Sequence, residues 1–176
     1  MRLTYCAGAV VAALVLLAAN PLSAQSAEKK AASAASPCTD LDFWIGDWVV
    51  KDVNGVQVST ASIKPGENHC SVTETWTAAK VGGRNFFCLL AYSNEKHSWE
   101  YLAAASAPGF RLRYSNGVVN GNEIRWDASD LPDGTISHFS YFKLPDGRLR
   151  EFAQTSTDNG KTWKTVTDLS WTRSKR

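Results

Sequence analysis

Turn-forming residues recur along the chain from residue 54 onward, and they constrain its fold more than any other feature. Gly, Asn, Asp and Pro tolerate or preset the backbone angles of tight reversals. The turn positions are Asn54-Gly55, Pro65-Gly66, Gly82-Gly83, Asn94-Glu95, Pro108-Gly109, Asn116 to Gly121, Asp133-Gly134, Asp146-Gly147 and Asn159-Gly160. They separate runs that are rich in Val, Ile, Thr, Phe, Tyr and Trp, the residues that favour strands. The pattern predicts an antiparallel meander of about ten strands.

Short connections favour closure of this meander into a barrel. Many short strands hide their edges either in an up-and-down barrel or in a sandwich, and a sandwich usually needs long crossovers. We therefore predict an all-β, antiparallel up-and-down barrel of about ten strands within a single domain over residues 38–176. A barrel of this size is wide enough to hold a small ligand. Thr39 to Gly46 predicts a short N-terminal helical turn, whose Phe43, Trp44 and Ile45 plug one end of the barrel.

The first 37 residues differ in composition from the rest. Arg2 precedes an apolar run from Ala7 to Ala19, Asn20-Pro21 interrupts it, and small residues follow. This order is typical of a secretory signal peptide over residues 1–24, with an uncleaved anchor as the alternative. The run is shorter than the ~20 residues of a membrane span, so we predict no transmembrane segment after cleavage and a periplasmic or secreted location. Residues 25–37, made mostly of Ala, Ser and Lys, predict a disordered linker.

Charge and motif content exclude several functions. The chain has 19 Lys and Arg against 17 Asp and Glu with no basic stripe, which disfavours nucleic-acid binding. It contains no phosphate-binding loop, dinucleotide fingerprint or Gly-x-Ser-x-Gly elbow. The histidines His69, His97 and His138 share no metal-binding spacing, so we predict neither a metal nor a cofactor. A zinc site or a haem ligated by His138 is the alternative.

Three cysteines remain after the predicted cleavage, and register decides which two can meet. A turn at Gly82-Gly83 would place residue 77 opposite Cys88, which leaves Cys70 about 23 Å away along the strand. Disulfides tolerate Cα separations of only about 4.4–6.8 Å. We therefore predict a Cys38–Cys70 disulfide that staples the lead-in segment to the barrel. Cys88, flanked by Phe and Leu, is expected to be a buried and unreactive thiol.

Alternation along the strands identifies side chains that should point inward. In the third run, Glu74 and Trp76 share the apolar face that must lie inside, and burial there would raise the pKa of Glu74. The same reasoning turns Trp126 inward, together with the last-run residues Trp163, Thr165, Thr167, Leu169 and Trp171. The eighth and ninth runs leave open whether His138 and Glu151 point in or out. The candidate ligand-binding residues are thus Glu74, Trp76, Trp126, His138, Glu151, Thr167 and Trp171.

An apolar interior with a few polar groups is typical of small-molecule sites, so we predict binding of a small, largely apolar ligand. An enzyme is the first alternative, with Glu74 as general acid or base and His138 or Glu151 as its partner. A filled barrel without a cavity is the second alternative, acting as a structural or interaction module in which Glu74 pairs with an inward arginine. No catalytic residue is assigned, and the sequence leans away from an enzyme.

Three segments carry a resemblance to known proteins. Ser156 to Trp163 resembles the Asp-box hairpin of sialidases, which is structural there, and this implies a turn locked by Ser156 and Asp158 with Trp163 packed inward. Together with Asp42–Trp48 and Cys70–Trp76, it resembles a family of uncharacterised exported bacterial proteins, a domain of unknown function with a lipocalin-like, calycin-type barrel. The likeness covers nearly all of residues 42–173. It implies the barrel and the export signal and transfers no catalytic residue. More distant ten-stranded barrels include fatty-acid-binding and haem-binding proteins.

Overall fold

The computed structural model describes residues 36–107, 111–128 and 134–175. The predicted signal peptide and all but the last residues of the predicted linker lie outside the described residues. Two 3₁₀ turns, η1 (Pro37–Thr39) and η2 (Asp42–Trp44), precede the strands. The strands are β1 (Gly46–Lys51), β2 (Gln57–Pro65), β3 (Ser71–Ala78), β4 (Phe86–Ser93), β5 (Ser98–Ala105), β6 (Arg111–Asn120), β7 (Glu123–Ala128), β8 (Ile136–Lys143), β9 (Leu149–Ser156) and β10 (Lys164–Arg173).

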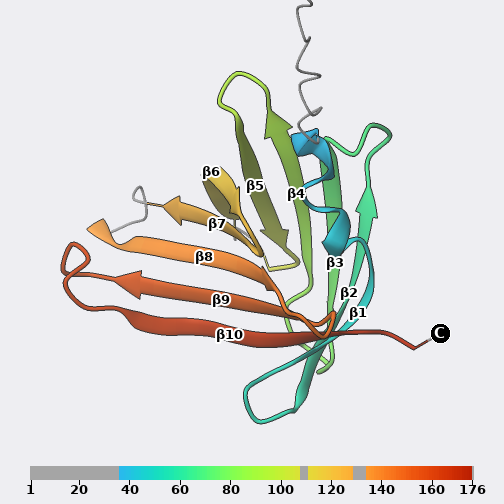
Figure 1. Cartoon of the computed structure of the whole chain (residues 1–176). Helices are drawn as coiled ribbons and strands as arrows, with labels where there is room; N and C mark the ends of the chain where they lie inside the picture. The colour runs from blue at the N-terminus through green and yellow to red at the C-terminus, as the bar shows by residue number, and fades with distance from the viewer. Residues whose placement is uncertain (1–35, 108–110, 129–133, 176) are drawn as a thin grey trace, which may run out of the picture. The chain divides into compact units, whose positions relative to one another are not determined.

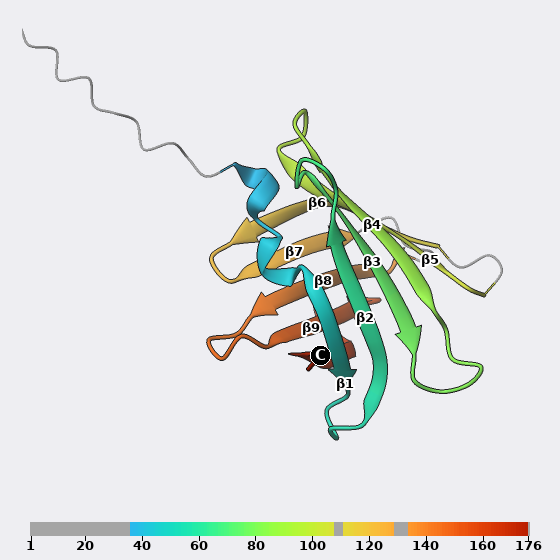
Figure 2. The ribbon, with the colours of Figure 1, turned by 90° about the vertical axis from the view of Figure 1, so that its right-hand side faces the viewer.

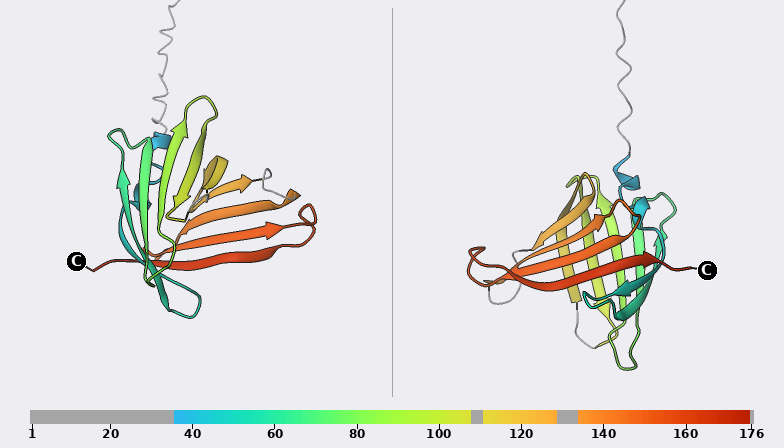
Figure 3. Two further views of the ribbon diagram at one scale, coloured as in Figure 1. Left: turned by 180° about the vertical axis from the view of Figure 1, so that it is seen from behind. Right: turned by 60° about the horizontal axis from the view of Figure 1, so that its bottom comes forward.

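The ten strands form a closed antiparallel barrel, which confirms the predicted fold class. Each strand pairs with the next in the chain, and β1 pairs with β10 to close the wall. Figures 1 and 3 show that β8–β10 run across β3–β5 at a steep angle. The buried apolar side chains form one core cluster. No helix among the described residues is long and apolar enough to cross a membrane.

The 3₁₀ turns plug one end of the barrel, as predicted. Figure 2 shows them on the same side as the β6–β7 and β8–β9 hairpins. Trp44 is fully buried, with its ring centroid 4.3 Å from that of Tyr141, and Leu41 is equally buried. The other predicted plug residues, Phe43 and Ile45, are only partly buried.

A disulfide fastens this plug to the wall. Cys38, in η1, is bonded to Cys70, immediately before β3, with a Cα–Cα distance of 4.2 Å. Cys88 is free and buried. The predicted pairing and the predicted free thiol are both confirmed.

Large side chains fill the half of the barrel nearest the plug. Trp48, Trp99, Trp126 and Trp171 are at most 1% exposed. Trp126 passes over Gly117 of β6 to donate a hydrogen bond of 2.9 Å to the carbonyl of Trp99. A Cβ atom at Gly117 would lie 2.1 Å from the indole nitrogen, so only glycine fits there.

The register shifts at three places in the wall, and two of these bulges, in β10 and β6, bear on the predictions. In β10, Thr165 pairs with Gln154 whereas Thr167 pairs with Ala153, so Val166 is an extra residue. Because the extra residue shifts the inward–outward alternation of side chains by one position, the residues before it face the opposite way from our prediction. Thr165 therefore lies on the outer face, whereas we predicted that it points inward. Trp163, before the bulge, also lies outside: its ring stacks on His138 at a centroid distance of 3.9 Å.

The second bulge lies in β6, where we predicted a turn. Trp99 of β5 pairs with Gly117 and Tyr101 pairs with Tyr114, which leaves an extra residue between them. Asn116 adopts a positive φ of 61° inside the strand, and the turn follows only after Asn120. The preference of Asn-Gly for positive φ, which we had interpreted as a chain reversal, is thus used here to form a bulge within the strand.

Candidate functional site

A cavity of about 430 Å³ occupies the half of the barrel away from the plug. It is lined by side chains from β3–β6 and β8–β10 that are mostly apolar. Its aromatic wall consists of Trp76, Phe86, Tyr101, Tyr114, Phe139 and Tyr141. Val166, more than half exposed, lies where the cavity approaches solvent. A volume of this size falls within the range of about 300–1,000 Å³ that is usual for small-molecule sites.

Four of the seven candidate residues meet in this cavity. Glu74, Trp76, Glu151 and Thr167 line it, from β3, β9 and β10. The open question for Glu151 is thus answered: its side chain points inward. Trp126 and Trp171 point inward as expected, but they are fully buried beside the cavity and do not line it. His138 is not part of the lining.

Glu74 lies in the wall of the cavity and is only 2% exposed. The register places it directly opposite Cys88 on β4, where we had expected residue 77. The β3–β4 loop is centred earlier in the chain than Gly82-Gly83, and this accounts for the error. Burial raises the pKa of Glu74 from 4.5 to about 7, although a hydrogen bond with Cys88 opposes the shift. Its Oε2 atom has no hydrogen-bond partner.

A short hydrogen-bonded chain leads to Glu74. The hydroxyl of Tyr101 donates to Sγ of Cys88 at 3.2 Å, and Cys88 in turn bonds to Glu74. Burial, followed by the nearby Glu74 charge, raises the pKa of the Cys88 thiol far above its ordinary value. Cys88 therefore stays protonated and donates a hydrogen bond, so it is a poor nucleophile.

Glu151 supplies the second carboxyl group. Its Oε2 accepts a hydrogen bond of 3.1 Å from the indole of Trp171. Burial, followed by the charge of Glu74, raises the pKa of Glu151 from 4.5 to about 8, although the hydrogen bond from Trp171 opposes the shift. Because the two groups repel each other when ionised, they titrate as a pair. Near neutral pH the pair retains at least one proton.

Among the described residues that line the cavity, no positive side chain balances these carboxyl groups. The described residues that line the cavity include no Lys, Arg or His. The inward arginine that the filled-barrel alternative requires is therefore missing from the described lining, and the cavity itself argues against a filled barrel. The arrangement can hold and exchange a proton, donate a hydrogen bond when protonated, or face a cation when ionised.

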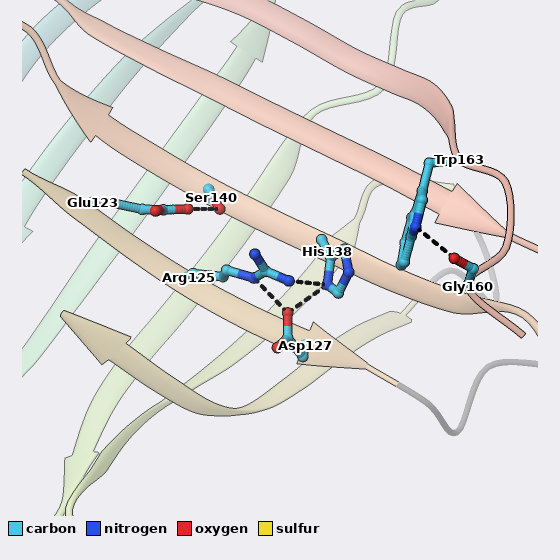
Figure 4. Close-up of polar contacts among 7 residues, drawn as sticks. All are labelled: Glu123, Arg125, Asp127, His138, Ser140, Gly160 and Trp163. Carbon is cyan, nitrogen blue, oxygen red and sulfur yellow. Dashed lines mark hydrogen bonds and ion pairs between the residues drawn. The ribbon is translucent and has the colours of Figure 1, made fainter. Parts of the chain in front are cut away.

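His138 belongs to a polar cluster on the outer face of the wall (Figure 4). Its Nδ1 lies 2.6 Å from Oδ1 of Asp127 and 2.7 Å from Nη2 of Arg125. One ring nitrogen cannot donate to the carboxylate and accept from the guanidinium at once, so only one of these bonds forms at a time. Because its strand neighbours Ser137 and Phe139 line the cavity, His138 points to the opposite side of the sheet.

The predicted Asp-box turn lies beside this cluster. Oγ of Ser156 accepts a bond from the N–H of Gly160 at 2.9 Å, and Asp158 accepts from the N–H of Thr162, also at 2.9 Å. The Thr162 hydrogen bonds lower the pKa of Asp158 to about 2. Ser156 and Asp158 thus lock the turn as expected, whereas Trp163 packs outside the barrel.

Two functional candidates escaped the sequence reasoning. Tyr101 and Tyr141 are buried, they face both carboxyl groups, and the pKa of each is raised well above 10 by burial and then by nearby charge. Trp99 and Tyr101 flank the charged Glu100, a pattern that could have revealed an inward face. Tyr141 lay in the eighth run, whose inward face the sequence left open.

Comparison of the chain with protein-family models and with curated proteins finds no match. Among the described residues, no group of three or more His, Cys, Asp and Glu side chains could hold a metal ion. The cavity and its carboxyl groups are therefore the features of the molecule that point to a function.

Proposed function

We propose that this chain is an exported barrel protein that binds a small, largely apolar molecule in its cavity. The observation that carries the proposal is the cavity of about 430 Å³, with an aromatic wall and two oriented carboxyl groups. Apolar cavities with a few placed polar groups are the usual form of small-molecule sites. Binding energy would come from burial of the ligand against Trp76 and its aromatic neighbours, at roughly 25 cal/mol per Å² of apolar surface.

Export is proposed on two grounds. The order of residues 1–24 is that of a signal peptide, and the Cys38–Cys70 disulfide suits an oxidising compartment such as the periplasm or the extracellular space. We also propose, on the motifs quoted above, that the chain is a relative of the lipocalin-like exported family.

The binding proposal is tested with N-phenylnaphthylamine, a neutral lipophilic fluorophore. Its emission should rise saturably with added protein, and tryptophan emission should fall because Trp76 lines the cavity. An Ala103→Phe variant places a ring inside the cavity and should abolish binding. The matched Ala104→Phe variant changes the neighbouring, exposed position on β5 and should bind as the wild type does.

Two results would contradict this function. One is the absence of saturable binding for N-phenylnaphthylamine and for a wider panel of neutral lipophilic compounds. The other is equal binding by the Ala103→Phe and Ala104→Phe variants, which would place the probe on the outer surface. Native mass spectrometry of protein purified from its native compartment would identify a co-purifying molecule directly.

Catalysis is the second candidate, and the pair of carboxyl groups favours it. A pKa near the working pH is what a general acid or base needs, and the values of about 7 and about 8 for Glu74 and Glu151 meet that need. The partner in this version is Glu151, because His138 faces outward. An NMR titration of Glu74 is the test: a pKa near the ordinary ~4.3 would remove the support for catalysis.

A further inference from the structure

The cavity contains an imbalance of charge that a ligand could correct. Glu74 and Glu151 face it from opposite parts of the wall, β3 and β9, and each raises the pKa of Tyr101 and Tyr141 through its charge. The described lining contains no Lys, Arg or His. Ionised carboxylates are costly to bury unless a positive charge compensates them, and the described lining supplies no cation to these two.

An unpartnered atom points to the same conclusion. Oε2 of Glu74 is buried without a hydrogen-bond partner, although the residue is only 2% exposed. Buried carboxyl oxygens nearly always have partners, and an exception calls for an explanation. Since Glu74 lines the cavity, a donor on a bound molecule can supply the missing bond.

We propose that the molecule bound in this cavity is an organic cation: an amine whose apolar body lies against the aromatic wall and whose ammonium group is held between Glu74 and Glu151. The inference rests on the proposed ligand-binding function and specifies its substrate class. Ring faces attract ammonium groups, and the wall offers Trp76, Tyr101 and Tyr141 for this contact. A charge-assisted hydrogen bond to a carboxylate supplies both strength and orientation.

The same chemistry argues against an acidic ligand. A fatty acid, the ligand type of one group of ten-stranded barrels, would bring a carboxylate next to two others. Like charges in a site of low dielectric repel strongly, and the described lining has no arginine to receive the anion. In this chain a fatty acid would bind only in its protonated form.

Cation binding should release protons. Among the described residues, six titratable side chains face the cavity: Glu74 on β3, Cys88 on β4, Tyr101 on β5, Tyr114 on β6, Tyr141 on β8 and Glu151 on β9. The residues that the described strand β10 contributes, Val166, Thr167 and Leu169, do not titrate. The thiol and the phenols have raised pKa values and stay protonated, so only the glutamate pair titrates near neutrality. An ammonium group favours the ionised carboxylates. The affinity for the amine should therefore rise with pH, by about tenfold per pH unit for each proton that is released on binding. The rise should level off above the upper pKa of the glutamate pair, near 8.

Three probes with one body and different head groups test the inference: phenylbutylamine, phenylbutanol and phenylbutyrate. Isothermal titration calorimetry at pH 8 should give the amine at least about tenfold tighter binding than the alcohol, with the carboxylate weakest. Repeating the amine titration at pH 7 in buffers of different ionisation heat should show about one proton released.

Charge variants assign the effect to the cavity. A Glu74→Gln, Glu151→Gln double variant keeps the volume and should bind amine and alcohol equally. Asp168→Asn makes the same type of change on the outer face of β10, where Asp168 pairs with Arg150, and should keep the amine preference.

The outcomes separate this inference from the proposed function. If the alcohol or the carboxylate binds as tightly as the amine at pH 8, or no proton is released, the cation proposal is overturned while ligand binding stands. If the double variant keeps its preference for the amine, the two glutamates do not hold the ammonium group and the proposal also falls. If N-phenylnaphthylamine binds and none of the three probes does, the cation proposal again fails. If neither the probes nor N-phenylnaphthylamine binds, the proposed function itself fails.

Discussion

Replacement of Glu74 by glutamine should stabilise the ligand-free protein at neutral and alkaline pH. Glutamine has nearly the same shape and volume as glutamate but carries no charge. The wild-type carboxyl group is buried and lacks a partner at Oε2. The protein therefore bears a cost whenever Glu74 ionises, and the glutamine variant does not.

The pKa values give the size and the pH window of this effect. An unfolded Glu74 ionises near pH 4.5 and the folded one near pH 7. Because the folded pKa is the higher one, folding stability falls as pH rises from about 4.5 to about 7 and stays low above that. At ~1.36 kcal/mol per pH unit, this interval amounts to about 3 kcal/mol. Near pH 4 both forms are protonated, so variant and wild type should be almost equally stable there.

Urea unfolding at pH 4 and pH 8, with the disulfide intact, measures this difference. We expect the free energies of unfolding to agree at pH 4, and the variant to exceed the wild type by about 3 kcal/mol at pH 8. Asp168→Asn is a control in which the free energy of unfolding should change in the opposite direction. The hydrogen bonds from Arg150 lower the pKa of Asp168, so removing the Asp168 carboxylate should destabilise the protein at pH 8. A Glu74→Gln variant that is no more stable than the wild type at pH 8 would refute the claim that burial penalises this carboxyl group.

Three further predictions concern the frame of the barrel and its outer face. Gly117→Ala should lower the free energy of unfolding by about 1–3 kcal/mol, measured in urea, because the new methyl group would meet the indole of Trp126. Removing the Cys38–Cys70 disulfide by a double serine substitution should cost about 4 kcal/mol for its sequence separation of 32 residues, measured as a lower unfolding midpoint that reducing agent no longer changes. His138→Gln should leave the affinity for N-phenylnaphthylamine unchanged within about twofold, since the side chain lies outside the barrel; a larger loss in fluorescence titration would contradict the assignment of His138 to the outer face.

Local chemistry made the barrel predictable. Hairpin turns are encoded by a few neighbouring residues, and β strands by alternation over six to ten, so both can be recognised without tertiary information. Local patterns were also enough to predict that Glu74 and Trp76 point inward and that Trp44 belongs to the plug. The Cys38–Cys70 pairing followed because the register excluded the competing pair.

Bulges were not predictable because no residue signal distinguishes a bulge from an ordinary strand or a turn. Val166 is an ordinary strand residue, yet its insertion in β10 turned Trp163 and Thr165 outward. Asn116 has a clear preference for positive φ, but a turn and a bulge use that preference equally. Glu74 and Glu151 line the same cavity because strands β3 and β9 face each other across the closed barrel. No local sequence pattern encodes which strands face each other.

Closure of the wall by β1 and β10 has a consequence for how the protein is made. Trp48 pairs with Arg173, so the contact that completes the barrel joins segments at nearly opposite ends of the folded region. Such non-local contacts slow folding, because the chain must lose entropy before it gains them. Until residues 164–173 have been synthesised, β1 and β9 both present unpaired edges, which are templates for aggregation. A chain that ended before β10 would therefore be an open sheet with two unpaired edge strands. The nascent protein depends on its final strand to pair these edges and so to prevent aggregation.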